Sequence, residues 1–374
     1  MKLRFLNCLL FASIVLAGIS RVQADQPAHE PLTIGVMVSL SGNWAAIGEM
    51  TRKGLILAAE DLNSRGGILG RLVNFEFQDT DEAVSAAKVI SAYRFLRSKN
   101  IEILIGPTGS PGGIALAPIA SRDKVLVITP SVGVRDFHST GDNLFNAQGV
   151  WEASSAMLAR YVRSQRIERI AIFSSQHPFE VRQADAFESA FREAGGEVVI
   201  RREPNPEITD LRSDALRIVQ SGVPAAFYAN YNQMGIAAKQ LSQAGFKGLQ
   251  FATQIDASRL VPADRALNGT IFTRLTDDPT DKFDSDFRKR FNEAPSYTAD
   301  FAYDALLAIA HAAQRAGSLE IQPLKSAMSQ VSFKGASGDF AFDLEGCVIR
   351  RPTVWKVEEE KFLFVSALER KDNN

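Results

Sequence analysis

Short apolar, β-branched runs alternate with segments of helical periodicity along the chain, and this alternation restricts the fold more than any other feature. The first runs are LTIGVMVSL, LVNFEFQD, IEILIG and VLVITP, with helical patterns between them. Strands joined through helices pair in parallel with right-handed crossovers. The sequence therefore predicts an α/β protein built on a doubly wound sheet.

The alternation restarts after residue 150. A helix is expected from Trp151 to Gln165, followed by the strand-like runs RIAIFSS, GEVVIRRE, AAFYAN and LQFATQ with helical patterns between them. Two βα series of similar size predict two Rossmann-like lobes. No Pro- or Ser-rich linker separates the lobes, which favours short crossings that act as a hinge.

The N-terminus has the pattern of a secretory signal. Lys2 and Arg4 precede an apolar run from Phe5 to Ile19, and Val22-Gln23-Ala24 follows. The apolar run is shorter than the ~20 residues of a membrane-spanning helix. Residues 1–24 are therefore expected to be a secretory signal peptide that is cleaved between Ala24 and Asp25. A retained membrane anchor is the alternative.

The remaining composition excludes several classes of protein. Beyond the signal segment the only cysteine is Cys347, so neither an internal disulfide nor a structural zinc site is expected. The formal charge is -1, with acids and bases interspersed. This gives no electrostatic footprint for nucleic acid. No later apolar run approaches ~20 residues, so the exported protein is expected to be soluble.

Neither a catalytic motif nor a cofactor motif is present. The sequence lacks C-x-x-C, H-E-x-x-H, G-x-S-x-G, P-loop and dinucleotide patterns. His177 follows a predicted strand and could belong to a site, or it is a partly exposed loop residue. Asp79 and Asp81 could form a pair of carboxylates, or they lie in a solvated turn. The protein is not expected to be an enzyme or to bind a metal.

Two glycine-containing loops follow predicted strands, SLSGNWAAIGEM at 39–50 and GPTGSPGG at 106–113. Glycine permits close backbone approach, and the free N–H groups at a helix start suit a carboxylate or a phosphate. Ligands of open α/β sheets bind beyond the carboxyl ends of the strands. The side chains expected there are polar or aromatic: Ser41 to Trp44, Ser110, Ser131, Phe179, Tyr231, and Gln254 to Asp256.

At these positions the sequence resembles the leucine/isoleucine/valine-binding proteins, the solute-binding components of branched-chain amino-acid ABC transporters. The specific signals are S-G with a downstream G, the N-x-x-G-G-I-x-G-R turn at Asn63 to Arg71, and Asp79. The resemblance continues through ILIGPTGS, VLVITPS, RIAIFSS, YANYNQMG and SGDFAFDLEG. It covers nearly all of the chain beyond the signal segment.

The resemblance implies a type I periplasmic binding protein fold with a three-crossing hinge. The crossings would fall near Ala147-Gln148, Phe272-Thr273 and Val348-Ile349. The first lobe would comprise residues 31–147 and 273–348, and the second lobe residues 148–272 and 349–374.

The function implied is a monomeric periplasmic protein that closes on an amino acid or a related small carboxylate and delivers it to an inner-membrane ABC permease. Two alternatives remain open. One is a periplasmic ligand sensor that passes closure to a signalling partner. The other is an exported hydrolase that uses Ser110 or Ser131 as its nucleophile.

By the same resemblance, eight residues are expected to bind the solute: Trp44, Ser110, Ser131, Gly133, Phe179, Tyr231, Gln254 and Asp256. The chain departs from the amino-acid binders at three of them. Gly133 stands where a hydroxyl residue is usual, Phe179 where a tyrosine is common, and the loop that often carries an acid reads TQID with Asp256. A less polar or aromatic carboxylate is therefore an alternative to an amino acid.

Overall fold

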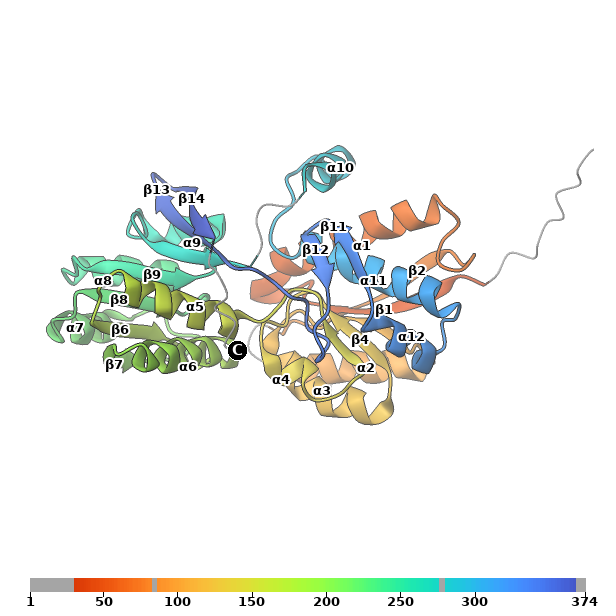
Figure 1. Cartoon of the computed structure of the whole chain (residues 1–374), viewed down its shortest axis with the longest axis horizontal. Helices are drawn as coiled ribbons and strands as arrows, with labels where there is room; N and C mark the ends of the chain where they lie inside the picture. Colours follow the sequence, from red (N-terminus) through yellow and green to blue (C-terminus); the bar gives the residue numbers. More distant parts are fainter. Residues whose placement is uncertain (1–29, 83–85, 276–279, 368–374) are drawn as a thin grey trace, which may run out of the picture.

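The computed structural model describes residues 30–82, 86–275 and 280–367, which form two α/β lobes lying side by side (Figure 1). Each lobe has its own central sheet. The α/β class and the two sheets agree with the alternation in the sequence. The expected signal segment lies outside the described residues.

The first sheet has five parallel strands in the order β2-β1-β3-β4-β5. These strands are β1 (Leu32–Val38), β2 (Val73–Asp79), β3 (Ile103–Ile105), β4 (Leu126–Thr129) and β5 (Leu144–Asn146). Strands β1 and β2 pair along their whole length, from Leu32 opposite Val73 to Val38 opposite Asp79. The short strand β5 was not predicted.

Helices cover both faces of the first sheet, and α10 packs against α1 rather than against the sheet. The helices of this lobe are η1 (Gly42–Trp44, a 3₁₀ turn), α1 (Ala45–Asn63), α2 (Ala87–Ser98), α3 (Ser110–Asp123), α4 (Arg135–His138), α10 (Asp281–Phe291), α11 (Ala299–Ala316) and α12 (Ile321–Met328). Because successive strand residues point to opposite faces, Ile34 and Val36 pack with α1 and α11, whereas Met37 packs with α2 and α3. A hairpin of β11 (Ser332–Gly335) and β12 (Gly338–Ala341) completes this lobe.

The second sheet has seven strands in the order β14-β13-β10-β9-β8-β6-β7. They are β6 (Arg169–Ser174), β7 (Glu197–Arg202), β8 (Ala225–Ala229), β9 (Leu249–Thr253), β10 (Ile271–Arg274), β13 (Thr353–Glu358) and β14 (Lys361–Ala367). The last two come from the end of the chain and pair antiparallel. The other five pair in parallel. Four of them were predicted from the βα series, whereas β10 was not.

The helices of the second lobe also lie on both faces of their sheet. They are α5 (Trp151–Ser164), α6 (Pro178–Glu193), α7 (Arg212–Gln220), α8 (Met234–Gln243) and α9 (Ala257–Ala263). Along β6, Ile172 packs with α5 and α6, and its neighbour Phe173 packs with α7 and α8. Among the described residues, no helix is both long and apolar enough to cross a membrane.

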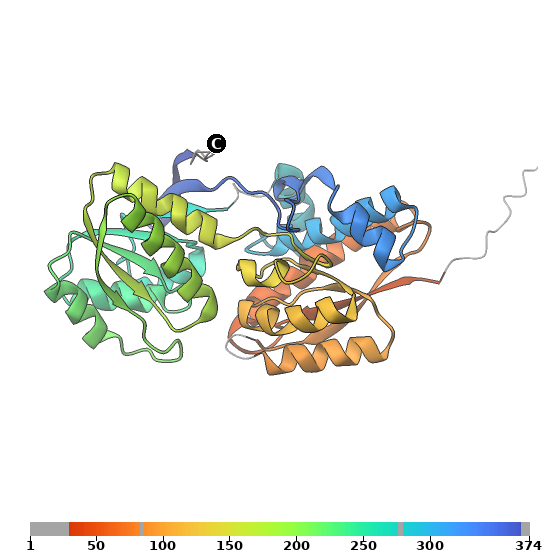
Figure 2. The ribbon, with the colours of Figure 1, turned by 60° about the horizontal axis from the view of Figure 1, so that its bottom comes forward.

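The lobes are joined by chain crossings (Figure 2). The first crossing leads from β5 to α5, and the last leads from the β11–β12 hairpin to β13. They run side by side, because the N–H of Asn146 donates to Gly346 O (2.8 Å) and the N–H of Val348 donates to Asn146 O (2.9 Å). The other crossing differs from expectation. Phe272 and Thr273 are both inside β10, so the chain leaves the second sheet only after Arg274.

Arg350 ties the two adjacent crossings together. Its guanidinium donates to Ala147 O (2.7 Å) and Gln148 O (2.9 Å) of the first crossing, and to Ser337 Oγ (2.9 Å) of the hairpin. A guanidinium offers several donors in a fixed plane, which allows one side chain to satisfy acceptors on two segments. The Arg350 side chain therefore fixes where the two adjacent crossings lie relative to the first lobe.

Replacing Arg350 with Met should lower the free energy of unfolding by about 2–4 kcal/mol, because several acceptors lose a charged donor. Urea denaturation measures the change. Arg351→Met is the matched control, since Arg351 is exposed and should change stability by less than about 0.5 kcal/mol. Equal stability of the two variants would show that the guanidinium does not hold the crossings.

Candidate functional site

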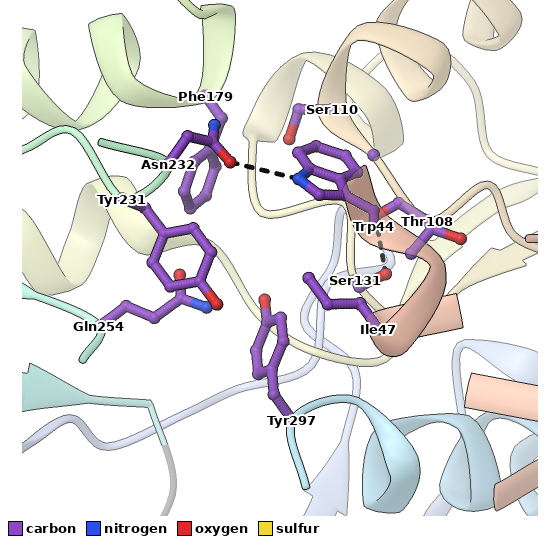
Figure 3. Close-up of a pocket in the computed structure, with 11 residues that line it drawn as sticks. Trp44, Ile47, Thr108, Ser110, Ser131, Phe179, Tyr231, Asn232, Gln254 and Tyr297 are labelled. Carbon is purple, nitrogen blue, oxygen red and sulfur yellow. Dashed lines mark hydrogen bonds between the residues drawn. The ribbon is translucent and has the colours of Figure 1, made fainter. Parts of the chain in front are cut away.

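A cavity lies between the lobes (Figure 3). Its lining residues come from both lobes: Trp44, Ile47, Thr108, Gly109, Ser110, Ser131, Phe179, Tyr231, Asn232, Gln254 and Tyr297. Most of them lie in loops that follow the carboxyl ends of strands, as the rule for open sheets predicts. Six of the eight predicted residues line this cavity, and Gly133 and Asp256 do not.

Asp79 shapes the loop that carries Trp44. Its Oδ1 accepts hydrogen bonds from the backbone N–H groups of Leu40 (2.8 Å) and Ser41 (3.2 Å). Gly42 has a φ of +71°, and a Cβ there would lie 1.9 Å from Asp81 Oδ1. The tight turn leads through η1 to Trp44. Asp79 is exposed at the end of β2, in agreement with the solvated-turn alternative, and its hydrogen bonds support this loop.

The loop before α3 forms the polar part of the first wall. Ser131 Oγ donates to Thr108 O (2.8 Å), and the Thr108 N–H donates to Glu82 Oε1 (2.7 Å). Glu82 is fully buried, and burial raises the pKa of its carboxyl to about 7. Next in the loop, Gly109 allows the ring of Trp44 to approach, because a Cβ would lie 2.3 Å from Trp44 Cζ3. Ser110 then begins α3 at the cavity.

A second buried glutamate supports the opposite wall. Glu180 Oε1 accepts from the backbone N–H of Asn232 (2.9 Å) and from its Nδ2 (3.0 Å). Burial raises the pKa of Glu180 to about 7. Since the amide nitrogen of Asn232 is held by Glu180, its Oδ1 faces the first lobe and accepts from Trp44 Nε1 (3.2 Å). Glu180, Asn232 and Trp44 thus form a hydrogen-bonded chain between the lobes, which we name the interlobe latch.

His177 lies behind the latch. It is only 2% exposed, and its ring meets the ring of Trp44 edge to face at 5.8 Å. The interpretation of His177 as a partly exposed loop residue is therefore wrong. Helix α6 begins immediately after it, and its burial follows from the packing of that helix start against Trp44.

Gly133 has a packing role where a ligand contact was expected. A Cβ on this residue would lie 2.5 Å from Phe179 Cε2 and 2.6 Å from Trp151 Cδ1. The ring of Phe179, which belongs to the second lobe, thus occupies the place where a side chain at 133 would extend. The absence of a side chain at Gly133 is what lets the two lobes approach here.

Asp256 is also turned away from the cavity. Its Oδ2 accepts a hydrogen bond from the hydroxyl of Tyr231. Its Oδ1 caps α9 by accepting a hydrogen bond from the N–H of Ser258 (2.8 Å). These hydrogen bonds orient the carboxylate away from the space between Trp44 and Phe179. Among the described residues that line the cavity, the polar groups are hydroxyls, amides and backbone groups, without a charged side chain.

Gln254 and Tyr297 form the end of the cavity nearest the crossings. Gln254 has a φ of +52°, a strained conformation for a residue with a side chain. Its N–H donates to Thr273 O (3.0 Å), but its Oε1 has no hydrogen-bond partner in the described part of the chain. The hydroxyl of Tyr297 accepts from Gln148 of the first crossing.

Five lining residues were not among the eight named from the sequence: Ile47, Thr108, Gly109, Asn232 and Tyr297. Ile47, Thr108 and Gly109 nevertheless lie inside the two glycine-containing loops, 39–50 and 106–113, that were expected to hold a ligand. Asn232 directly follows the predicted residue Tyr231. Tyr297 precedes α11, and no strand ends near it. The sequence therefore gave no signal for Tyr297.

The fold and this site between two lobes define a protein of the periplasmic binding class. A family model described as "Periplasmic binding protein" matches residues 31–352, so the chain belongs to that family. Its members are solute-binding proteins rather than enzymes, which excludes the hydrolase alternative.

Individual relatives agree with this assignment. The chain is 27% identical to the Leu/Ile/Val-binding protein BraC3 of Rhizobium johnstonii, over 86% of this chain and 87% of that protein. It superposes on a leucine-binding protein LivK from Thermotoga maritima with a TM-score of 0.83 at 21% identity, covering 91% and 99% of the two chains. It also superposes on a solute-binding protein from R. palustris in complex with benzoate. The TM-score is 0.81 at 17% identity, covering 90% of this chain and 96% of that chain. The type I periplasmic binding fold is thereby confirmed.

Replacing Trp44 with Phe keeps an aromatic ring but removes the N–H that donates to Asn232. Affinity for any solute that stabilises the protein should fall about 2- to 10-fold, the usual worth of one neutral hydrogen bond. Trp44→Ala should cost more, because the ring is also lost. Isothermal titration measures both variants.

Trp355→Phe is the matched control for Trp44→Phe. The indole N–H of Trp355 donates to Thr353 Oγ1 (2.8 Å) within the second lobe. This variant should lose stability without losing affinity. Unchanged affinity in Trp44→Ala would show that Trp44 does not face the solute.

Gly133→Ala should weaken solute binding at least about tenfold, because the added methyl overlaps Phe179 and overpacking costs about 1–3 kcal/mol. The double variant Gly133→Ala/Phe179→Leu should recover much of this loss relative to Phe179→Leu alone, since the smaller side chain makes room. Isothermal titration of the four proteins tests the coupling. Strict additivity of the two substitutions would contradict it.

Proposed function

We propose that this protein is the solute-binding component of an ABC importer, and that it captures a small carboxylate with an apolar or aromatic body. The observation that carries the proposal is the composition of the interlobe cavity. One wall offers a helix start and hydroxyl groups, and the other offers aromatic rings and amides. Such a cavity suits recognition of a solute, which the importer's permease then receives.

The carboxylate is assigned to the start of α3. The N–H groups of a helix start carry partial positive charge and have no partners within the helix. Ser110 supplies a hydroxyl at the same place, and Ser131 lies beside it through its hydrogen bond to Thr108 O. An anion bound here would be held without a basic side chain, as is common at helix N-termini.

The body of the solute is assigned to the rings of Trp44, Phe179 and Tyr231. Aromatic faces stack on an apolar or aromatic ligand at about 0.5–1.5 kcal/mol beyond simple burial. The α-ammonium of an amino acid would also need an acceptor, but Asp256 is already engaged by Tyr231 and by the start of α9. A carboxylate without an α-ammonium therefore fits these residues better than a free amino acid. Both kinds of ligand occur in the names of the similar proteins.

Closure couples binding to transport in this proposal. A solute that touches both walls adds contacts only when the lobes are together, so it shifts the population toward the closed state. The interlobe latch and the ion pair between Arg182 of α6 and Asp136 of α4 (2.6 Å) already connect the lobes. The permease would recognise the closed surface. Export through residues 1–24 would place the protein in the periplasm, where the permease is accessible.

Thermal unfolding with a panel of solutes tests the proposal on protein freed of bound ligand by denaturation and refolding. Benzoate, 4-hydroxybenzoate and phenylacetate are compared with leucine, isoleucine and phenylalanine at equal concentrations. A ligand present at 100 times its Kd stabilises by about 2.7 kcal/mol. At least one carboxylate without an ammonium group should raise Tm by several degrees, and by more than the amino acids do.

The site assignment is tested in the same assay with Ser110→Ala, which should reduce the shift. Ser121→Ala, at the far end of α3, is the matched control and should leave the shift unchanged. Larger shifts with the amino acids would make the proposed ligand class wrong while leaving solute binding in place. No shift with any compound would count against the function itself.

A further inference from the structure

A second, larger cavity adjoins the first on the side of the crossings. The two cavities share Gln254 and Tyr297, which therefore stand at their junction. Figure 3 shows these two side chains beside Tyr231, at the edge of the first cavity. The proposed carboxylate site does not account for the second cavity.

The charged groups of the second cavity differ from those of the first. It is lined by the carboxylates of Asp256 and Asp300 and by the guanidinium of Arg274. The guanidinium lies over the rings of Trp355 and Phe362, at 4.2 and 4.9 Å from their centroids. Asp256 is occupied by Tyr231 and by the start of α9. Asp300 is therefore the carboxylate in this cavity that we consider as a partner for a cationic group of a ligand.

Asp300 lies in the first turn of α11 and is 6% exposed. Burial and the neighbouring Asp304 raise its pKa to about 7, an effect that the charge of Arg350 only partly offsets. The N–H groups of Arg350 donate to Ala147, Gln148 and Ser337 rather than to Asp300. A buried carboxylate in this position would gain from a cation that enters the cavity.

Gln254, at the junction of the two cavities, offers a hydrogen-bond acceptor to a ligand that extends into the second cavity. Gln254 is 5% exposed, and its Oε1 lacks a partner in the described part of the chain. A buried acceptor without a donor costs about 1–3 kcal/mol, and a ligand N–H placed there would remove that cost. The positive φ of Gln254 is a strained backbone conformation, and the hydrogen bond from its N–H to Thr273 O (3.0 Å) helps to hold it.

We propose that the second cavity continues the solute site and takes the far end of a ligand in which a carboxylate is joined through an amide to a cationic group. A dipeptide is the simplest such ligand. Its carboxylate would bind at the start of α3 and its side chain among the aromatic rings. Its amide N–H would donate to Gln254 Oε1, and its ammonium would pair with Asp300. This inference rests on the proposed function, because it assumes the carboxylate site of the first cavity.

Three probes with the same phenyl and carboxylate end separate the parts of the proposal. They are 3-phenylpropanoate, N-acetylphenylalanine and glycylphenylalanine, which in that order add an amide and then an ammonium. Isothermal titration at pH 8 measures their affinities. Glycylphenylalanine should bind at least about tenfold more tightly than N-acetylphenylalanine, as expected for a hydrogen bond to a charged group.

Asp300→Asn should remove this advantage of glycylphenylalanine and leave the affinity for N-acetylphenylalanine within about twofold of the wild type. Asp339→Asn, an exposed substitution in the same lobe, is the matched control and should change neither affinity. Ala257→Trp gives an independent test, because Ala257 lines only the second cavity and is exposed. It should abolish the gain from the extension while 3-phenylpropanoate still binds.

The outcomes distinguish this inference from the proposed function. If 3-phenylpropanoate binds but the dipeptide gains nothing, the second cavity is not part of the solute site and the proposed function stands. An equal loss of affinity for all three probes in Asp300→Asn would also overturn the inference, since it would indicate a structural role. If none of the three probes binds and the solute panel also gives no shift, the proposed function fails with it.

Discussion

Both sheets are covered by helices on their two faces, and the position of the site depends on this constraint. Strands buried on both sides can present side chains to a solute only from the loops at their ends. In each lobe these loops face the other lobe, so Ser110 and Ser131 of one sheet meet Phe179 and Tyr231 of the other. The cavity lies between the two lobes for that reason.

The two lobes support their loops in the same way. Glu82 holds the backbone of the loop before α3, and Glu180 holds the backbone of the loop before α8. A buried carboxylate is costly unless donors surround it, and here the donors include N–H groups of the loops that line the cavity. Each carboxylate therefore helps to fix the conformation of its loop. Through Asn232, the second of these supports also reaches Trp44 on the opposite lobe.

The division into two cavities follows from where the lobes touch. Phe179 packs over Gly133 on one side, and Gln254 and Tyr297 stand together on the other. No charged side chain is among the described residues that line the first cavity. The second cavity is lined by two carboxylates and by a guanidinium that stacks on aromatic rings. The electrostatics of the space between the lobes thus change from one end to the other. A long solute would meet both environments, and a short one only the first.

The sequence by itself determined the α/β class, the two βα series and most of the cavity wall, because hydrophobic periodicity and strand ends are local properties. Trp44, Ser110 and Tyr231 were found in this way. Short elements such as β5 and α12 have too few residues for a periodic pattern, and they form because the rest of the lobe supplies their packing partners.

Only the tertiary structure decided which neighbours each side chain has. Gly133 and Asp256 stand at the predicted loops, yet Phe179 fills the space beside one, and Tyr231 turns the other away from the cavity. Tyr297 reaches the cavity from the start of α11, more than 160 residues after Ser131 and Gly133. Side-chain orientation and contacts between distant segments depend on how the two lobes close against each other, and no local pattern records that arrangement.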